Sequence, residues 1–167
     1  MSKLNWRQLL LHFIAFWFFI HAFETFSFLY DTRLVDIVRH SNNQDLNQKL
    51  ADENISAGEL TYFVVWKNIS GFIGLLVAFI VSLLISIKKH WFWLNSLIVL
   101  ITTYFLYSFD LLGWTYLKRV FWRFGQTFSD TKVEFITNGV FLLTIGLLIF
   151  FLNRTNTFIE NRRVVTV

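Results

Sequence analysis

The sequence contains no cysteine and no proline among its 167 residues. Without cysteine, the chain can form no disulfide, thiolate zinc site or iron–sulfur cluster, and it has no thiol nucleophile. Without proline, it lacks the proline-broken helices by which some transporters build their binding sites. These absences exclude several classes of enzyme and transporter before any motif is considered.

Charged residues are also scarce. Asp, Glu, Lys and Arg make up 16% of the chain, against about a quarter in a typical soluble domain. Hydrophobic residues make up 55%, and there are 21 Phe and 7 Trp. A small soluble core cannot bury that much aromatic surface, so we expect an integral membrane protein.

Four apolar stretches are long enough to cross a bilayer, which takes about 20 mainly apolar residues. They cover residues 9–30, 62–87, 91–112 and 135–152. Lys3 and Arg7 precede the first stretch, as in a signal peptide, but the apolar run is too long and no small-x-small cleavage site follows it. We therefore interpret it as a retained anchor. The chain is predicted to be all-α, a single transmembrane domain over residues 1–167 built as a four-helix bundle.

Basic residues beside the spans predict the orientation. They lie before the first span, in the turn between the second and third, and after the fourth: Lys3, Arg7, Lys88, Lys89, Arg154, Arg162 and Arg163. The loops 31–61 and 113–134 fall on the other side. The second of these loops runs against the rule, because it also contains basic residues: Lys118, Arg119, Arg123 and Lys132. Three basic regions thus lie on one side and only one on the other. This predicts a multi-pass protein of the bacterial inner membrane whose two termini, including the tail 153–167, are cytoplasmic.

The connections between the spans carry local signals. Only Lys88, Lys89 and His90 separate the second span from the third, so these two spans should form an antiparallel hairpin. Ser56 and Glu59 fit a capping box at the start of the second span. The polar stretch 31–54, with scattered apolar positions, fits one or two short surface helices.

The segment 113–131 is amphipathic, basic and aromatic, which is typical of a helix that lies in the headgroup layer. Its apolar positions recur at helical spacing: Leu117, Val120, Phe121, Phe124 and Phe128. We expect an interfacial helix between spans three and four, serving as an anchor or as the frayed end of span three. The alternative is a specific lipid site in which Lys118, Arg119 and Arg123 contact headgroups.

Ionisable groups inside a membrane are costly, so each is a candidate functional residue. Glu24 lies six residues before Tyr30, about 9 Å inward along a helix. Lys67 lies five residues after Tyr62 on an antiparallel span and reaches a similar depth. Glu134 opens span four at the same end. The candidate cluster in the outer half comprises His21, Glu24, Lys67, Asp110 and Asn138.

Helical spacing supports this convergence. Lys67 shares a face with small residues that let helices approach closely: Gly71, Gly74, Ala78 and Ser82. In the third span, Ser96, Thr103 and Asp110 are spaced by sevens and predict a polar stripe. The inner halves of the spans, by contrast, are expected to be plain apolar packing.

Two interpretations of the outer cluster remain open. Glu24 can form a structural ion pair with His21 or Lys67, and such pairs are no evidence of activity. Alternatively, the groups line a hydrated vestibule that binds a polar ligand, ion or headgroup, or relays protons through His21 and Glu24. We favour the structural interpretation.

No cofactor, metal site or catalytic residue is predicted. The histidines are His12, His21, His40 and His90. His12 and His90 both lie toward the inner side, but because His90 sits in the turn, a haem held between them is not the favoured interpretation. His21 and Glu24 offer two metal ligands where zinc requires three or four. The sequence contains no zinc-protease, nucleophile-elbow or P-loop motif.

We therefore expect a subunit or accessory of a larger membrane complex, whose partners are membrane lipids and other membrane subunits or a second copy. The alternative is an oligomeric transporter or channel for a small ion or polar solute that uses the outer cluster. A lipid-modifying enzyme is the least favoured class. Nucleic acid is not an expected partner, because the basic residues flank spans and no reading motif accompanies them.

Overall fold

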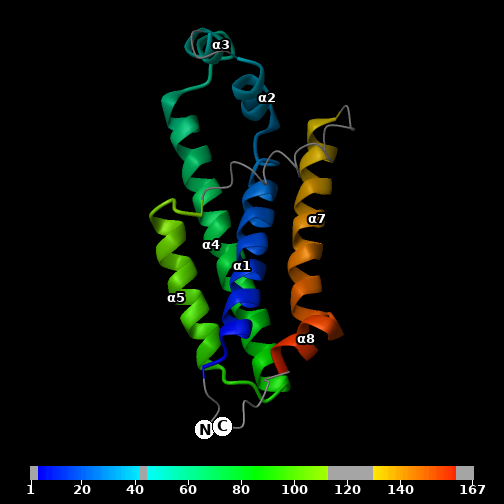
Figure 1. The fold of residues 1–167 in the computed structure, drawn as a ribbon. Coiled ribbons are helices and arrows are strands. Elements are labelled where there is room, and N and C mark those ends of the chain that lie inside the picture. The colour runs from blue at the N-terminus through cyan, green and yellow to red at the C-terminus, as the bar shows by residue number, and fades with distance from the viewer. Residues whose placement is uncertain (1–3, 42–44, 113–129, 161–167) are drawn as a thin grey trace, which may run out of the picture.

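The computed structural model describes residues 4–41, 45–112 and 130–160, and all regular structure in these ranges is helical. The helices are α1 (Trp6–Ser27), α2 (Thr32–His40), α3 (Leu46–Asp52), α4 (Ala57–Lys88), α5 (Leu94–Ser108), α7 (Thr131–Phe151) and α8 (Asn153–Glu160), as drawn in Figure 1. The predicted all-α fold is confirmed for the part of the chain that the structure describes.

Three of these helices, α1, α4 and α7, are long and apolar enough to cross a membrane. They correspond to the first, second and fourth predicted spans. The third prediction, 91–112, is wrong at both ends, because α5 covers only the 15 residues Leu94–Ser108. At 1.5 Å per residue it is about 22 Å long, which is short of the roughly 30 Å of a hydrocarbon core.

Left-handed residues end α4 and α5. His90 follows α4 with a φ of 53°, and Asp110 follows α5 with a φ of 54°. In both places the next amide bonds back to the final turn, Trp91 N to Ser86 O at 2.8 Å and Leu111 N to Leu106 O at 2.8 Å. This is the Schellman pattern, which stops a helix. Asp110 therefore lies beyond α5 rather than on its polar stripe.

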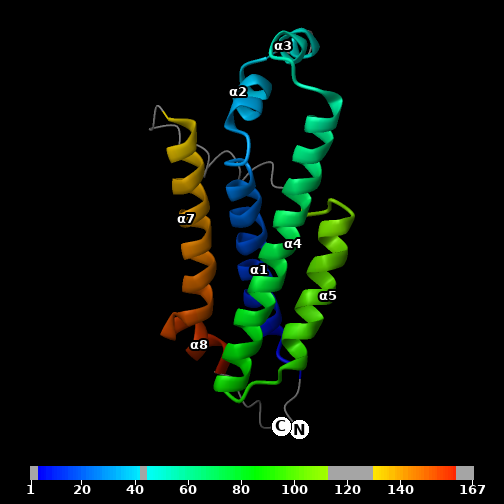
Figure 2. The same ribbon diagram turned by 180° about the vertical axis from the view of Figure 1, so that it is seen from behind.

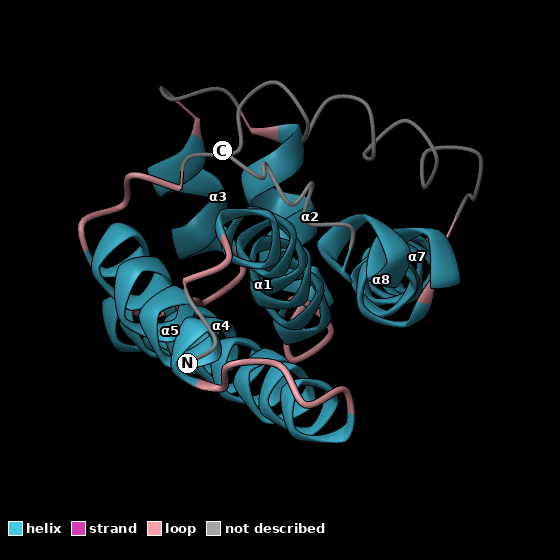
Figure 3. Cartoon of the chain, turned by 60° about the horizontal axis from the view of Figure 1, so that its bottom comes forward, coloured by secondary structure: helices cyan, strands magenta, loops and turns pink. Residues whose placement is uncertain are grey.

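α1 is the central helix. It packs along α4 and α7 and also contacts α5, whereas α5 and α7 do not touch each other. Figures 2 and 3 show the same arrangement, with α4 and α5 on one side of α1 and α7 on the other. The predicted hairpin of spans two and three is confirmed as α4 and α5. The described helices thus form an open arrangement around α1, with α5 and α7 as edge helices.

Glycine allows α1 and α4 to approach closely. A methyl group added at Gly74 would lie 2.7 Å from the backbone oxygen of Phe19. Gly71, Gly74, Ala78 and Ser82 are all buried, as the small-residue face predicted. Around this contact the middle of the molecule is an apolar core, comprising Ala15, Phe16, Phe19, Ile20, Leu75, Ala78, Ile85, Val99 and Phe150.

The outer end is capped by two short helices, as expected for residues 31–54. Leu34 of α2 and Leu50 of α3 form a small second core with Ile55. The predicted capping box is present: Ser56 N donates to Glu59 Oε2 at 2.7 Å, and Glu59 N donates to Ser56 Oγ at 3.2 Å. Thr131 donates to Asp36 at 2.8 Å and so ties the start of α7 to α2.

The inner end contains a helix, α8, that folds back beneath α1. Asn5 Nδ2 donates to the carbonyl of Ile159 at 3.0 Å, and Arg7 Nη1 donates to the carbonyl of Phe158 at 3.0 Å. These donors satisfy carbonyls in the last turn of α8, which have no partner within a helix. The start of α1, the end of α8 and the α4–α5 turn therefore lie together at one end (Figure 1).

Candidate functional site

The outer polar cluster is built around the Glu24 carboxylate. His21 Nδ1 lies 2.7 Å from Glu24 Oε2, one turn away on α1. Tyr107 of α5 donates its hydroxyl to Glu24 Oε1 at 3.0 Å. Lys67 of α4 places Nζ 3.8 Å from the same oxygen. Three helices thus bring one acid, one imidazole, one phenol and one amine together.

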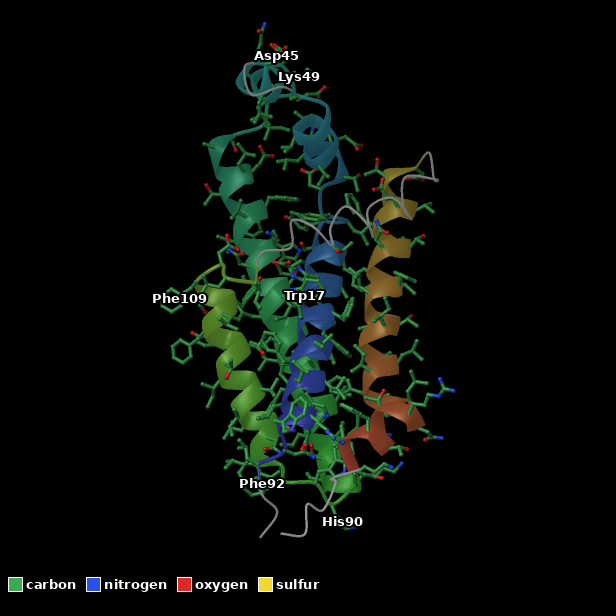
Figure 4. All side chains as sticks on the ribbon, in the orientation of Figure 1. Trp17, Asp45, Lys49, His90, Phe92 and Phe109 are labelled. Atoms are coloured by element: carbon green, nitrogen blue, oxygen red, sulfur yellow. The ribbon has the colours of Figure 1, made fainter. Side chains whose placement is uncertain are left out.

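Trp17 forms one wall of this cluster. Its ring meets the His21 ring edge-on with centroids 4.9 Å apart. The indole N–H donates to the carbonyl of Leu112 at 3.4 Å, beyond the end of α5. Figure 4 labels Trp17 on α1 in the middle part of the molecule, and Phe109 projecting outward at the upper end of α5.

The acid and the imidazole of the cluster are nearly closed to solvent, Tyr107 is partly buried, and the amine is the most exposed. The side chains of His21 and Glu24 are 10% and 11% exposed, whereas that of Lys67 is 41% exposed. The Lys67–Glu24 contact is also the longest of the three. Lys67 is therefore the member that can leave the cluster or meet a ligand, while Glu24 keeps its contacts with His21 and Tyr107.

The structure assembles only part of the predicted cluster. It brings His21, Glu24 and Lys67 together. Asp110 is exposed beyond α5 and makes no hydrogen bond or ion pair with these three among the described residues. Asn138 is buried on α7, and its Oδ1 has no hydrogen-bond partner in the described ranges. The predicted headgroup contacts Lys118, Arg119 and Arg123 lie outside the described residues, as does most of the interfacial helix predicted for 113–131.

Tyr107 is the member that sequence reasoning missed. It lies one turn after Thr103, which was assigned to the polar stripe of the third span. The spacing by sevens leads from Thr103 to Asp110 and passes over Tyr107. A spacing of four also keeps two residues on one helix face, and from Thr103 it leads to Tyr107.

A second polar cluster lies in the inner half and overturns the expectation of plain apolar packing there. Asn95 Nδ2 donates to Gln8 Oε1 at 2.7 Å, and Gln8 Nε2 donates to Ser86 Oγ at 2.9 Å. Ser96 Oγ lies 3.0 Å from Ser86 Oγ and 2.8 Å from Ser82 Oγ. His12 Nδ1, which lies 2.7 Å from Ser82 Oγ, is the last member of this series of hydrogen bonds.

All six members of the inner cluster are buried, at 1% exposure or less. They come in pairs from α1, α4 and α5, so the cluster joins the three helices. Rings enclose His12, whose centroid lies 6.1 Å from that of Trp91 and 5.1 Å from that of Phe150. The sequence analysis names His12, Ser82 and Ser96 separately but does not predict that they meet Gln8, Ser86 and Asn95 in one cluster.

An apolar layer separates the two clusters. Phe16, Phe19 and Leu75 lie between them along the helices and are at most 2% exposed. Thr103 is the hydroxyl at this level on α5, and its Oγ1 has no partner among the described side chains. None of the hydrogen bonds named above crosses this layer between Glu24 and His12. Nor do the described residues contain a group of three or more His, Asp or Glu that could hold a metal ion.

The described residues thus form an all-helical structure with three helices able to span a membrane, which is compatible with a multi-pass membrane protein. Comparison of the chain with protein-family models, curated proteins and solved structures finds no match.

Proposed function

We propose that the chain is a small multi-pass membrane protein that acts as a subunit or accessory of a larger membrane complex. The observation that carries this proposal is the open arrangement of the helices. α5 and α7 each pack on α1 but not on each other. Each edge helix therefore has a face that no other described helix covers, and a partner subunit can pack there.

The exposed side chains of α7 support this role. They form an apolar face along the helix: Val133, Ile136, Val140, Phe141, Leu147, Leu148 and Phe151. Gly139 and Gly146 do not belong to this face, since Phe26 and Phe19 fill the space beside them. The polar groups of the two clusters are largely bonded to one another, and the outer end is two short helices. Neither feature favours a catalytic site.

The distribution of charge supports the proposed topology, with both termini cytoplasmic in a bacterial inner membrane. At the inner end, residues 4–8, 86–95 and 151–160 carry Arg7, Lys88, Lys89 and Arg154 against the single acid Glu160. Acidic residues outnumber basic ones at the described outer end. Basic residues accumulate on the cytoplasmic side of membrane proteins.

A photocrosslinking experiment tests the proposed partner face. A photoreactive phenylalanine analogue replaces Val140 or Leu148 on the open face of α7, or the buried Phe150 of the same helix as an internal control. We expect crosslinks from Val140 and Leu148 to one other protein in native membranes. Crosslinks to lipid alone from both open positions would contradict the proposal.

A second candidate is an oligomeric transporter or channel for a small ion or polar solute. The partial exposure of Lys67 beside buried Glu24 favours it, because a site needs a member that solvent can reach. The apolar layer between the clusters counts against it. Glu24→Gln and Lys67→Met should each abolish flux in proteoliposomes while the protein stays folded. If neither change alters flux, the pair is structural.

A further inference from the structure

The inner end gathers positive charge from three parts of the chain that are distant in sequence. Arg7 comes from α1, Lys88 and Lys89 from the end of α4, and Arg154 from α8. The segments that carry them lie at the same end of the molecule (Figure 1), because α8 folds back beneath α1, where Asn5 and Arg7 bond to its last turn. We call these four basic residues the inner collar.

Exposed aromatic side chains accompany the inner collar. Trp6 is 62% exposed and Trp93 is 51% exposed, at the starts of α1 and α5. Tryptophan concentrates at the membrane–water interface, where its ring sits among headgroups and its N–H finds a polar partner. For a chain that spans a membrane, these rings favour a location of the collar at the depth of the phosphate groups.

Three members of the collar are available to a ligand. Lys88 and Arg154 are exposed. Lys89 contacts Glu160 at 3.7 Å, but both side chains are well exposed, at 38% and 49%, and exposed pairs of this kind contribute little. Arg7 is already engaged, since it donates to Phe158 and lies 4.6 Å from the centroid of that ring. It positions α8 rather than competing for a ligand.

We propose that the inner collar binds the headgroups of anionic phospholipids. Basic side chains next to a membrane attract anionic lipid by about 1 kcal/mol each, which corresponds to about a fivefold change in affinity per charge. Screening by salt should weaken the interaction, because the groups are exposed. The site differs from the headgroup contacts predicted at Lys118, Arg119 and Arg123, which the sequence analysis expects at the other end.

The test titrates the purified full chain in detergent micelles with phosphatidylglycerol or phosphatidylcholine and counts bound lipid by native mass spectrometry. The variant K88Q/K89Q/R154Q removes the three available charges. The matched control R33Q/K49Q/K132Q removes three exposed charges from the outer end. Equal thermal unfolding temperatures establish that both variants fold.

The wild-type chain should prefer phosphatidylglycerol, and K88Q/K89Q/R154Q should lose on the order of a hundredfold in affinity for it, from about fivefold per charge. The control should stay within about threefold of wild type, while E160Q should bind more tightly because it removes the acid beside Lys89. Equal affinity for the two lipids, or equal losses in both triple variants, would overturn the proposal. Displacement of lipid by an equimolar polyglutamate peptide would assign the collar to an acidic protein segment instead.

Discussion

Glu24 and Tyr107 are joined by a hydrogen bond of 3.0 Å although 83 positions separate them in the sequence. The bond crosses from α1 to α5, and α4 makes room for it. A methyl group added at Gly71 would overlap the Tyr107 hydroxyl. One glycine on α4 thus lets a phenol on α5 reach a carboxylate on α1, so three helices meet at one buried acid.

Substitutions around Glu24 should lower the free energy of unfolding by different amounts, depending on how deeply the lost contact is buried. Glu24→Ala leaves His21 and Tyr107 without their acceptor, and removing one partner from a buried polar cluster costs about 3–5 kcal/mol. Tyr107→Phe removes one hydrogen bond to a charged group, about 1.5–3 kcal/mol. Lys67→Met should cost less than about 1 kcal/mol, because the pair is partly exposed. Unfolding in detergent micelles measures all three, and a larger loss for Lys67→Met than for Tyr107→Phe would refute this ranking.

The contact between α1 and α4 can be tested with two glycines. Gly74→Ala should destabilise the protein by about 1–3 kcal/mol, since the new methyl group would meet the backbone of Phe19, which cannot move aside alone. Gly58 is the control, because the nearest atom to a new methyl group there is Ser56 Oγ at 3.6 Å. Gly58→Ala should be neutral or stabilising by up to about 1 kcal/mol. Equal unfolding temperatures for the two variants would mean that the helices are not in close contact.

The inner cluster predicts coupling between Gln8 and Asn95. Each single change to Leu leaves a buried amide without its partner, whereas the double change removes both groups. Hydrogen bonds between membrane helices contribute about 0.6 kcal/mol on average and up to about 1.7 kcal/mol. A double-mutant cycle on unfolding free energy should therefore give a coupling of about 0.5–2 kcal/mol. Strictly additive effects would show that the two side chains act independently.

The absence of cysteine makes the topology easy to measure, since a single introduced cysteine is the only thiol in the chain. Asp45→Cys places it at the outer end, and Thr157→Cys places it on the exposed side of α8. A membrane-impermeant maleimide added to intact cells should label the first and not the second. Labelling of Thr157→Cys but not Asp45→Cys would reverse the proposed orientation.

The long helices could be predicted because an apolar run of that length has few alternatives. The end of α5 could not, because it depends on Asp110 adopting a left-handed conformation. Asp tolerates that conformation better than most residues, but its place at the end of a polar stripe favoured a continued helix. The capping box was predictable because both partners lie within three residues of each other.

The contacts between helices were predictable only in part. The proximity of Glu24 to Lys67 followed from depth and from the small-residue face of α4. The inner cluster depends on how Gln8, Ser86 and Asn95 are rotated toward one another, and no spacing within a single helix sets that rotation. The position of α8 beneath α1 could not be predicted either. Asn5 and Arg7 bond to carbonyls of α8 only when the start of α1 and the end of α8 lie together in the folded protein.

The central claim is that the chain belongs to a larger membrane complex. The most direct test is to extract it from its native membrane in polymer-bounded lipid particles, without detergent, and to measure the mass and composition of the protein in each particle. We expect each particle to contain the 19.9 kDa chain together with a second protein at fixed stoichiometry, whichever of the two carries the affinity tag. Particles that contain this chain alone, as a monomer, would contradict it.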